Sequence, residues 1–247
     1  MAVDGLIYGW IAVAVITFFY LLKRPAPYGR HTKTNWGPMI NNQVGWFVME
    51  LPVLVLVVVY LFLAGISESV QSVLLLLFVF HYINRVFIYP LRLHTRGKQM
   101  PLIIALSAVV FNLVNGNVIG YYLTRVAQYP EGYFLSVQFI GGSLLFVAGL
   151  ILNWKSDATL INLRGPGETG YKIPTGGMFN WISCPNFFGE LVEWLGFAIL
   201  CWNPAGWSFF IWTFANLVPR AIDHHRWYQN KFADYPETRK AILPFVL

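Results

Sequence analysis

The chain alternates long apolar runs with short polar segments. Apolar residues dominate seven stretches, which are 6–22, 46–64, 73–91, 101–123, 133–153, 187–203 and 206–222. Most of these stretches approach the roughly 20 residues that an α-helix needs to cross a bilayer. The last two are shorter, and segment 203–206 between them suits a tight turn that joins antiparallel helices. The pattern therefore predicts an all-α integral membrane protein with seven transmembrane helices, in a single domain that spans residues 1–247.

One long polar segment, from residue 153 to residue 190, interrupts this pattern. It is rich in Gly, Pro and Asn, and it carries Arg164, Tyr171 and Lys172. Loops of this length are uncommon in compact domains and are usually functional. Side chains of these types are suited to an anionic ligand that contains rings. We therefore expect part of the functional machinery in this segment.

Composition supports the membrane assignment. The sequence is 57% hydrophobic and only 11% charged, with a mean hydropathy of +0.55, whereas soluble domains are about a quarter charged. No small-residue cleavage pattern follows the first apolar run, so we expect that run to be a transmembrane helix and not a signal peptide.

The basic residues gather in alternate connections between the apolar runs. They are Lys23, Arg24, Arg30 and Lys33 in the first connection, Arg92, Arg96 and Lys98 in the third, Lys155, Arg164 and Lys172 in the fifth, and Arg226, Lys231, Arg239 and Lys240 in the tail. By the positive-inside rule, the N-terminus lies on the non-cytoplasmic side and tail 223–247 lies in the cytoplasm. Seven crossings satisfy both statements. The net charge of +6 then reflects topology, and we infer no binding of nucleic acid.

Polar and ionisable side chains also occur inside the apolar runs. A charge at mid-membrane costs about 2.5–3.5 kcal/mol on insertion scales, so each such residue is a functional candidate. These residues are Glu50 in the second run, His81, Tyr82 and Arg85 in the third, Asn186, Glu190, Glu193 and Trp194 around the start of the sixth, and Arg220, His224 and Tyr228 in and after the seventh. Each alone can be an interfacial charge or a structural hydrogen bond between helices. Three such stripes that converge on one polar segment favour a binding site.

Familiar nucleotide and metal motifs are missing from the sequence. The run Gly165-Pro166-Gly167 is not G-x-G-x-x-G and follows no predicted strand, which excludes the soluble dinucleotide fold. Outside His224-His225 the histidines stand singly, so we expect no metal centre.

The cysteines and the basic residues can each be explained without a specific functional site. Cys184 and Cys201 have no metal or redox spacing, so we expect two buried thiols. Several basic residues suit the phosphates of a nucleotide, although positive-inside bias alone explains them as well. They are Arg96, Lys98, Arg164, Lys172 and Arg220.

Three stretches of sequence resemble a known family. The first contains Glu50-Leu51-Pro52 with His81-Tyr82 downstream. The second contains Asn153, Ser156-Asp157, Leu163-Arg164-x-Pro166-Gly167-Glu168 and Tyr171-x-Ile173-Pro174-x-Gly176-Gly177-x-Phe179. The third contains Arg220-Ala221, His224-His225-Arg226-x-Tyr228 and Asp234-Tyr235-Pro236. Together they resemble the steroid 5α-reductase family (3-oxo-5α-steroid 4-dehydrogenases), and closely its animal type 2 members.

The resemblance implies an NADPH-dependent membrane reductase of seven helices that saturates the C4–C5 double bond of a 3-oxo-Δ4-steroid. It implies a cytoplasmic cofactor-binding loop at 154–186, with the steroid deeper between the helices. The implied NADPH-binding residues are Arg96, Asn153, Asp157, Arg164, Tyr171, Lys172, Asn186, Glu190, Trp194, Arg220, His224 and Tyr228. Glu50 and Tyr82 would be catalytic and would meet the 3-keto oxygen, and Trp46 would line the same pocket.

The implied chemistry gives Glu50 and Tyr82 a reason to be there. Hydride addition to C5 of an enone pushes negative charge onto the 3-oxygen, and a donor placed there is worth about 2.7–4 kcal/mol in known oxyanion holes. The Tyr82 hydroxyl can donate. A desolvated Glu50 can donate in its neutral form or polarise Tyr82. The sequence leaves open which of the two donates.

Other expectations and alternatives follow from the same resemblance. The partners would be a steroid and membrane lipid, the protein a monomer, and the membrane the endoplasmic reticulum of a eukaryote or the inner membrane of a bacterium. Lys98 and Lys172 stand where the type 2 enzymes have Arg, and Asp223 stands where they have His. The alternatives are a membrane sterol double-bond reductase or isoprenylcysteine-type methyltransferase, and a non-enzymatic lipid-binding or transport protein.

Overall fold

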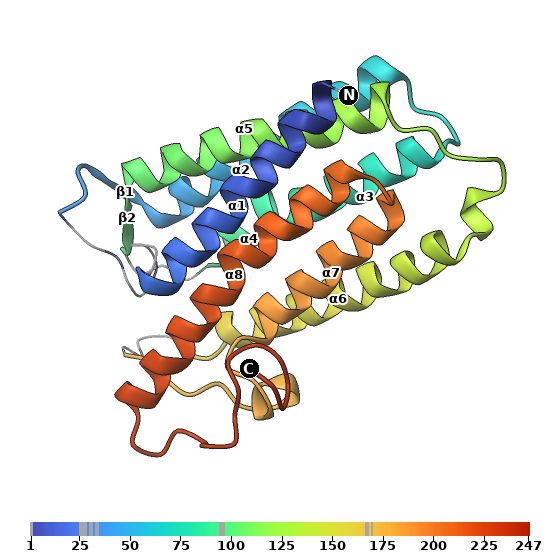
Figure 1. Ribbon diagram of the computed structural model, residues 1–247. Coiled ribbons are helices and arrows are strands. Elements are labelled where there is room, and N and C mark those ends of the chain that lie inside the picture. The colour runs from blue at the N-terminus through green and yellow to red at the C-terminus, as the bar shows by residue number, and fades with distance from the viewer. Residues whose placement is uncertain are drawn as a thin grey trace. The chain divides into compact units, whose positions relative to one another are not determined.

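The computed structural model describes residues 2–24, 29, 32, 35–93, 97–165, 168 and 170–247. Within these residues the long helices are α1 (Ala2–Lys23), α2 (Asn42–Ala64), α3 (Val70–Ile83), α5 (Leu102–Arg125), α6 (Val137–Ile161), α7 (Pro185–Cys201) and α8 (Pro204–Lys231) (Figure 1). A π-helical turn, η2 (Asn84–Ile88), and α4 (Tyr89–Arg92) continue α3 without a break. The short 3₁₀ turns are η3 (Tyr133–Leu135) and η4 (Gly177–Asn180), and β1 (Met39–Asn41) pairs antiparallel with β2 (Gln99–Pro101). The prediction of an all-α fold is confirmed.

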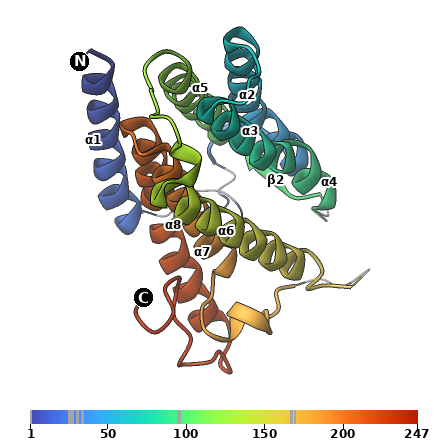
Figure 2. The same ribbon diagram turned by 90° about the vertical axis from the view of Figure 1, so that its right-hand side faces the viewer.

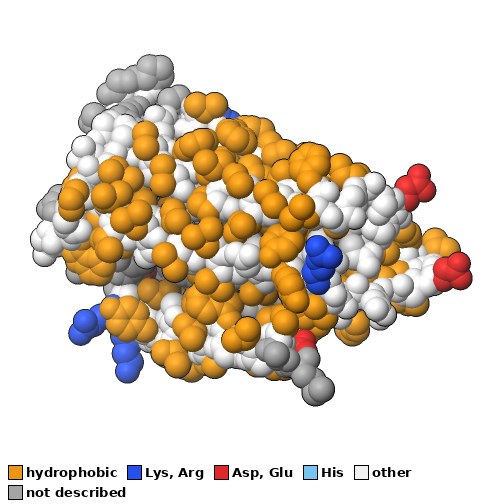
Figure 3. Space-filling model, turned by 90° about the horizontal axis from the view of Figure 1, so that it is seen from above, with side chains coloured by type: hydrophobic (Ala, Val, Ile, Leu, Met, Phe, Trp, Pro, Cys, Tyr) orange, Lys and Arg blue, Asp and Glu red, His pale blue; other side chains and the backbone are white. Residues whose placement is uncertain are grey.

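Five helical segments in the described residues are long and apolar enough to cross a membrane. They are Val3–Lys23, Asn42–Ala64, Val70–Arg92, Leu102–Arg125 and Val137–Ile161. Large apolar side chains on them face outward, such as Leu144, which is 69% exposed, and Figure 3 shows hydrophobic side chains over most of one face with few charges. These features support an integral membrane protein. Because α7 has only 17 residues and α8 carries many polar ones, seven crossings and their orientation stay predictions.

Contacts divide the chain into two compact units. One combines Met1–Pro25 with Ile140–Leu247, and the other is Ala26–Phe139. We call them the outer unit, because it holds both ends of the sequence, and the middle unit. The prediction of a single domain stays a prediction.

In the middle unit, α2 packs along α5 and also against α3 and η2. Asn112, Gly116 and Gly120 lie on one face of α5 at steps of four residues. A Cβ at Gly116 would lie 3.1 Å from the Leu56 side chain, and one at Gly120 would overlap the Tyr60 ring. The glycines therefore let α2 and α5 approach closely, as small residues do between membrane helices.

In the outer unit, α8 packs against both α1 and α7, which Figure 1 and Figure 2 show from two directions. A tight turn joins α7 to α8, as predicted from the sequence. The Asn203 side chain accepts hydrogen bonds from the backbone N–H groups of Ala205 and Gly206, both at 3.1 Å, and so caps α8. Both cysteines are buried thiols, as predicted.

Helices α6 and α7 meet backbone to backbone through glycines. A Cβ at Gly149 would lie 2.6 Å from the carbonyl oxygen of Gly189, and a Cβ at Gly196 would lie 2.7 Å from that of Gly142. The pairing runs in opposite directions along the two helices, so α6 and α7 are antiparallel. Any larger side chain at these positions would push the helices apart.

Parts of the predicted polar loop and of the predicted tail are helical. Helix α6 continues to Ile161 and α8 continues to Lys231, so residues 154–161 and 223–231 are helical. The polar side chains of Ser156 and Asp157 suggest a loop in the sequence, but both are buried in the structure. Polarity there marks a buried polar site and not the end of a helix.

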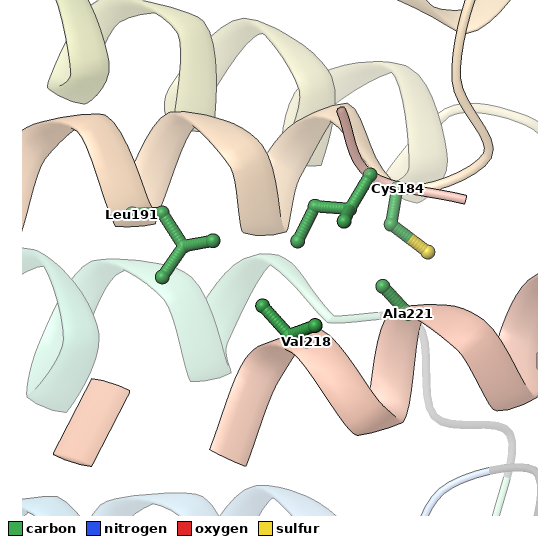
Figure 4. Close-up of a cluster of buried hydrophobic side chains, with 5 residues drawn as sticks. Cys184, Leu191, Val218 and Ala221 are labelled. Atoms are coloured by element: carbon green, nitrogen blue, oxygen red, sulfur yellow. The ribbon is translucent and has the colours of Figure 1, made fainter. Parts of the chain in front are cut away.

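The C-terminal segment is fixed to the start of α7. The backbone N–H of Ser183 donates to the carbonyl of Lys240 at 2.8 Å, and that of Cys184 donates to the carbonyl of Ala241 at 3.1 Å. Ile242 is fully buried and packs in a cluster with Cys184, Leu191, Val218 and Ala221 (Figure 4). This contact ties the end of the chain to both α7 and α8.

Candidate active site

Glu50 and Trp46 lie one turn apart in the first half of α2. Both are partly buried. The side-chain amide of Asn112, on α5, donates to the Glu50 Oε2 at 3.1 Å and to the Met49 carbonyl at 2.6 Å. Glu50 is therefore held by a polar partner inside an apolar helix pair.

Tyr82 lies at the end of α3 and is only 6% exposed. Its ring stacks on Phe78 with centroids 4.8 Å apart and meets His81 edge to face at 5.1 Å. The π-helical turn η2 begins two residues later, and such turns are frequent at functional sites. Packing thus fixes the ring and with it the direction of the hydroxyl.

Arg85 links the elements that carry the two predicted catalytic residues. It lies in η2, and its guanidinium stands 5.5 Å from the centroid of the Trp46 ring and 5.0 Å from that of Tyr89. The two rings meet edge to face at 5.5 Å. The cation–π contacts stabilise the packing of η2 against α2. Because η2 continues directly from α3, these contacts also help to hold the helix that carries Tyr82 beside the helix that carries Glu50.

Arg85 is recognisable in the sequence as an ionisable residue of an apolar run, but its role is not, and Asn112 is not among the residues predicted for the site. The only signal for Asn112 was an amide in an apolar run. The same run also contains Asn115 and Asn117, and each amide has many possible partners, so the link of Asn112 to Glu50 is visible only in the structure.

In the outer unit, three of the predicted cofactor-binding residues form one hydrogen-bonded chain. The Asn153 amide donates to the Asn186 carbonyl at 3.0 Å, and the Asn186 amide donates to the Asp157 Oδ1 at 3.1 Å. Asn153 and Asp157 are 2% and 5% exposed. Asn186 lies in the first turn of α7, where a carboxylate such as that of Asp157 is favoured by the helix dipole. The glycine contacts between α6 and α7 bring this chain together.

Arg164, Tyr171 and Lys172 lie near one another on the exposed loop. The Arg164 guanidinium stands 6.0 Å from the centre of the Tyr171 ring and donates to the Gly170 carbonyl at 3.1 Å. Lys172 forms an ion pair with Glu168 at 2.6 Å, and both side chains are close to half exposed. Tyr171 also meets Trp227 edge to face at 4.7 Å, a contact between loop and α8 that the sequence did not suggest.

The stripe of Arg220, His224 and Tyr228 continues along α8. His224 Nδ1 lies 3.8 Å from the Cys184 sulfur, and its ring is 5.5 Å from that of Phe187. Tyr228 is 3% exposed and stacks on Tyr235 at 5.3 Å. His224 thus faces the start of α7, whereas Tyr228 packs under the C-terminal segment.

Two residues of α7 complete the predicted set. Glu190 is partly buried one turn after Asn186. Trp194 is 1% exposed and packs edge to face on Phe146 and Phe209, at 6.4 and 4.5 Å. Its place is in the core between α6, α7 and α8, and its contact with a cofactor stays a prediction. Arg96 lies outside the described residues.

Burial and nearby charges shift two groups beside this set. Burial raises the pKa of the Asp223 carboxyl, and the cations of Arg226 and Arg220 offset part of that effect. Burial lowers the pKa of the His225 imidazole, and Lys240 and Arg239 lower it further. Among the described residues, no three His, Cys, Asp or Glu side chains gather as metal ligands would.

His225 belongs to a hydrogen-bonded cluster that anchors the C-terminal segment. The Ser183 hydroxyl lies 2.6 Å from His225 Nδ1 and 2.5 Å from the Tyr235 hydroxyl. Arg239 is 3% exposed and donates to the Pro174 carbonyl at 3.1 Å. The polar loop and the C-terminal segment are therefore held together by side chains whose anchoring role is not evident from the sequence.

We expect this anchor to loosen in mild acid. Because the pKa of His225 is lowered in the folded state, the unfolded chain takes up its proton first as pH falls below the ordinary value of about 6.5. The contribution of His225 to stability is thus present above that pH and is lost below it. Thermal unfolding of wild type and His225→Gln from pH 7.5 to 5 measures this. The variant should lose less stability across the range, and identical pH dependence in both would contradict the assignment.

Comparisons with known proteins agree with the sequence resemblance. A family profile described as 3-oxo-5-alpha-steroid 4-dehydrogenase matches residues 98–247. Steroid 5-alpha-reductase DET2 of Gossypium hirsutum is 42% identical over 245 residues, which cover 95% of this chain and 93% of the relative. The 3-oxo-5-alpha-steroid 4-dehydrogenase 1 of Bos taurus is 39% identical, covering 99% and 96%, and the type 2 enzyme of Rattus norvegicus is 41% identical, covering 93% and 91%.

Proposed function

Because the chain belongs to the 3-oxo-5-alpha-steroid 4-dehydrogenase family, we propose that it reduces the C4–C5 double bond of a 3-oxo-Δ4-steroid with NADPH. The observation that carries the proposal is the environment of Glu50. The Glu50 carboxyl lies on α2 between apolar helices and accepts a hydrogen bond from Asn112. Helix α2 packs against α3, which carries Tyr82. An ionisable group inside a membrane helix costs free energy of insertion. A reaction that develops negative charge on a substrate oxygen accounts for its presence, because a donor at that oxygen stabilises the transition state.

The residues of the outer unit fit NADPH in their chemistry. Arg164 and Arg220 offer planar guanidinium groups for phosphate oxygens, and Lys172 offers a point charge once it exchanges Glu168 for a phosphate. Tyr171 is 38% exposed and presents a ring for stacking. The chain of Asn153, Asn186 and Asp157 offers amide and carboxylate groups for ribose or carboxamide contacts. Glu190, Trp194, His224 and Tyr228 complete the proposed set in this unit, and Arg96, outside the described residues, belongs to the proposed set by family resemblance alone.

Tyr82 and Glu50 would act on the substrate. Bound NADPH supplies the hydride that adds to C5. The Tyr82 hydroxyl donates to the 3-keto oxygen, where the negative charge develops, and Glu50 either donates to the same oxygen or polarises Tyr82. Trp46, beside Arg85, lines the steroid pocket one turn away. A proton taken up at C4 from water completes the reduction.

The direct test is turnover by the purified protein in detergent or lipid. We expect progesterone or testosterone with NADPH to yield the 5α-reduced product. A folded preparation that gives no product with either NADPH or NADH would refute the proposal. Reduction of a C-7 or C-14 sterol double bond instead, or methyl transfer from S-adenosylmethionine, would support the alternative enzymes. Steroid binding without turnover would support a lipid carrier.

Replacing Asn186 should weaken NADPH binding. Asn186→Leu removes the amide that donates to Asp157. Leaving a buried carboxylate without one of its hydrogen bonds costs about 1–3 kcal/mol of free energy. We expect the Kd for NADPH to rise about tenfold or more, measured by nucleotide fluorescence. Asn216→Leu is the matched control, because the Asn216 amide donates to the Trp212 carbonyl of its own helix at 2.9 Å and Asn216 is not in the proposed cofactor site. Equal affinities in the two variants would argue against the site.

A further inference from the structure

Asn112 is a buried amide in α5, a mostly apolar helix that also carries Asn115 and Asn117. It is 4% exposed, and it reaches across to the first half of α2. Its two neighbours on the same face, Gly116 and Gly120, bring α5 close enough for this contact. A buried amide of this kind persists only when its hydrogen bonds are made.

The partners of Asn112 fix the orientation of its amide. The Met49 carbonyl can only accept a hydrogen bond, so the atom 2.6 Å from it must be the nitrogen of Asn112. The same nitrogen lies 3.1 Å from the Glu50 Oε2 and uses its second hydrogen there. Oε2 of Glu50 is therefore an acceptor in this contact.

We propose that Asn112 is a positioning residue that holds Glu50 by Oε2 and thereby confines the proton of neutral Glu50 to Oε1. A carboxyl oxygen that accepts from an amide N–H does not carry the proton, because two hydrogens would then face each other. The neutral carboxyl thus has a defined donor end and a defined acceptor end. This inference rests on the proposed function, since it assigns the donor end of Glu50 to the enone oxygen or to Tyr82.

Asn112 could instead serve only to tie α5 to α2. The chain offers a matched control for that role, because Asn117 lies on the same helix and also bonds to α2. The Asn117 Oδ1 accepts from the Tyr60 hydroxyl at 3.0 Å. Loss of either asparagine removes one such tie, but only Asn112 contacts Glu50.

Kinetics of matched variants separate the two roles. We expect Asn112→Leu to lower kcat about tenfold or more, while the Kd for NADPH and the KM for steroid change less than about threefold. Asn117→Leu should stay within about twofold of wild type. Asn112→Asp keeps the shape but has at most one donor, so it cannot serve Met49 and Glu50 together and should also lose kcat. Retained kcat in Asn112→Leu or Asn112→Asp would overturn the proposal.

An infrared measurement tests the hydrogen bond without relying on activity. The carboxyl C=O stretch of Glu50 is identified by its loss in Glu50→Gln, at a pH where the band is present. It should move to higher frequency in Asn112→Leu and stay in place in Asn117→Leu, because only the first removes a donor to that carbonyl. An unmoved band in Asn112→Leu, or no Glu50 carboxyl band at any pH at which the protein is folded, would overturn the proposal. If wild type reduces no steroid, the proposed function fails and the infrared result still decides this contact.

Discussion

Tyr82→Phe is expected to lower kcat about 100- to 1,000-fold while leaving NADPH affinity nearly unchanged. Removal of one oxyanion donor typically costs a reaction about 2.7–4 kcal/mol, which corresponds to that range. The ring of Tyr82 is fixed by Phe78 and His81, so the substitution removes the hydroxyl and leaves the packing in place. Single-turnover reduction of the steroid, together with a separate NADPH titration, measures the two effects.

A second tyrosine provides the control for this experiment. Tyr60→Phe also removes a hydroxyl from the middle unit, together with its hydrogen bond to Asn117, but Tyr60 is ten residues beyond Glu50 on α2. We expect it to change kcat less than about threefold. If Tyr82→Phe kept full turnover, Glu50 alone would have to stabilise the enolate oxygen. If it lost NADPH binding, the assignment of Tyr82 to the substrate would be wrong.

The helices could be predicted because a bilayer imposes their length and composition. Each long helix in the described residues matches one apolar run within a few residues at its start. The end of α6 could not be predicted, since Ser156 and Asp157 are polar yet buried. A local pattern records whether a residue is polar, but not whether a second helix covers it. For the same reason, the sequence pattern does not show that residues 223–231 of the predicted tail are helical.

The candidate site was predictable where residues act from one helix and not where they meet across helices. The step-of-four pattern of Arg220, His224 and Tyr228 identified a stripe on α8. The link between Asn112 and Glu50 joins residues 62 positions apart, and no local pattern reports it. Resemblance to the family suggested which residues to propose for cofactor binding, but the hydrogen-bonded chain from Asn153 through Asn186 to Asp157 is visible only in the structure.

That chain depends on how closely α6 and α7 approach. Asn153 lies one turn after Gly149 on α6, and a Cβ at Gly189 would lie 2.5 Å from the backbone nitrogen of Asn153. The hydrogen bond from the Asn153 amide to the start of α7 requires the two helix backbones to lie this close together. The glycines are therefore part of the site even though they carry no functional group.

The smallest substitution at this seam should be strongly destabilising. In Gly149→Ala the new methyl group would lie 2.6 Å from the Gly189 carbonyl and 2.7 Å from the Glu193 Cα. Both are backbone atoms that cannot rotate away, so the helices must separate. Overpacking of this kind costs about 1–3 kcal/mol or more, and we expect the midpoint of thermal unfolding to fall by about 5 °C or more. NADPH affinity should fall with it, because Asn153 and Asn186 move apart.

Gly141→Ala is the control, since it makes the same change on the same helix with nothing within 4 Å of the new Cβ. Alanine favours a helix over glycine by about 1 kcal/mol, so this variant should be as stable as wild type or more so. Gly189→Ala, on the facing helix, should lower the unfolding temperature as Gly149→Ala does, because each glycine contacts the backbone of the other helix. If Gly149→Ala unfolds at the same temperature as Gly141→Ala, then α6 and α7 do not touch through their backbones. The hydrogen-bonded chain would then need another explanation.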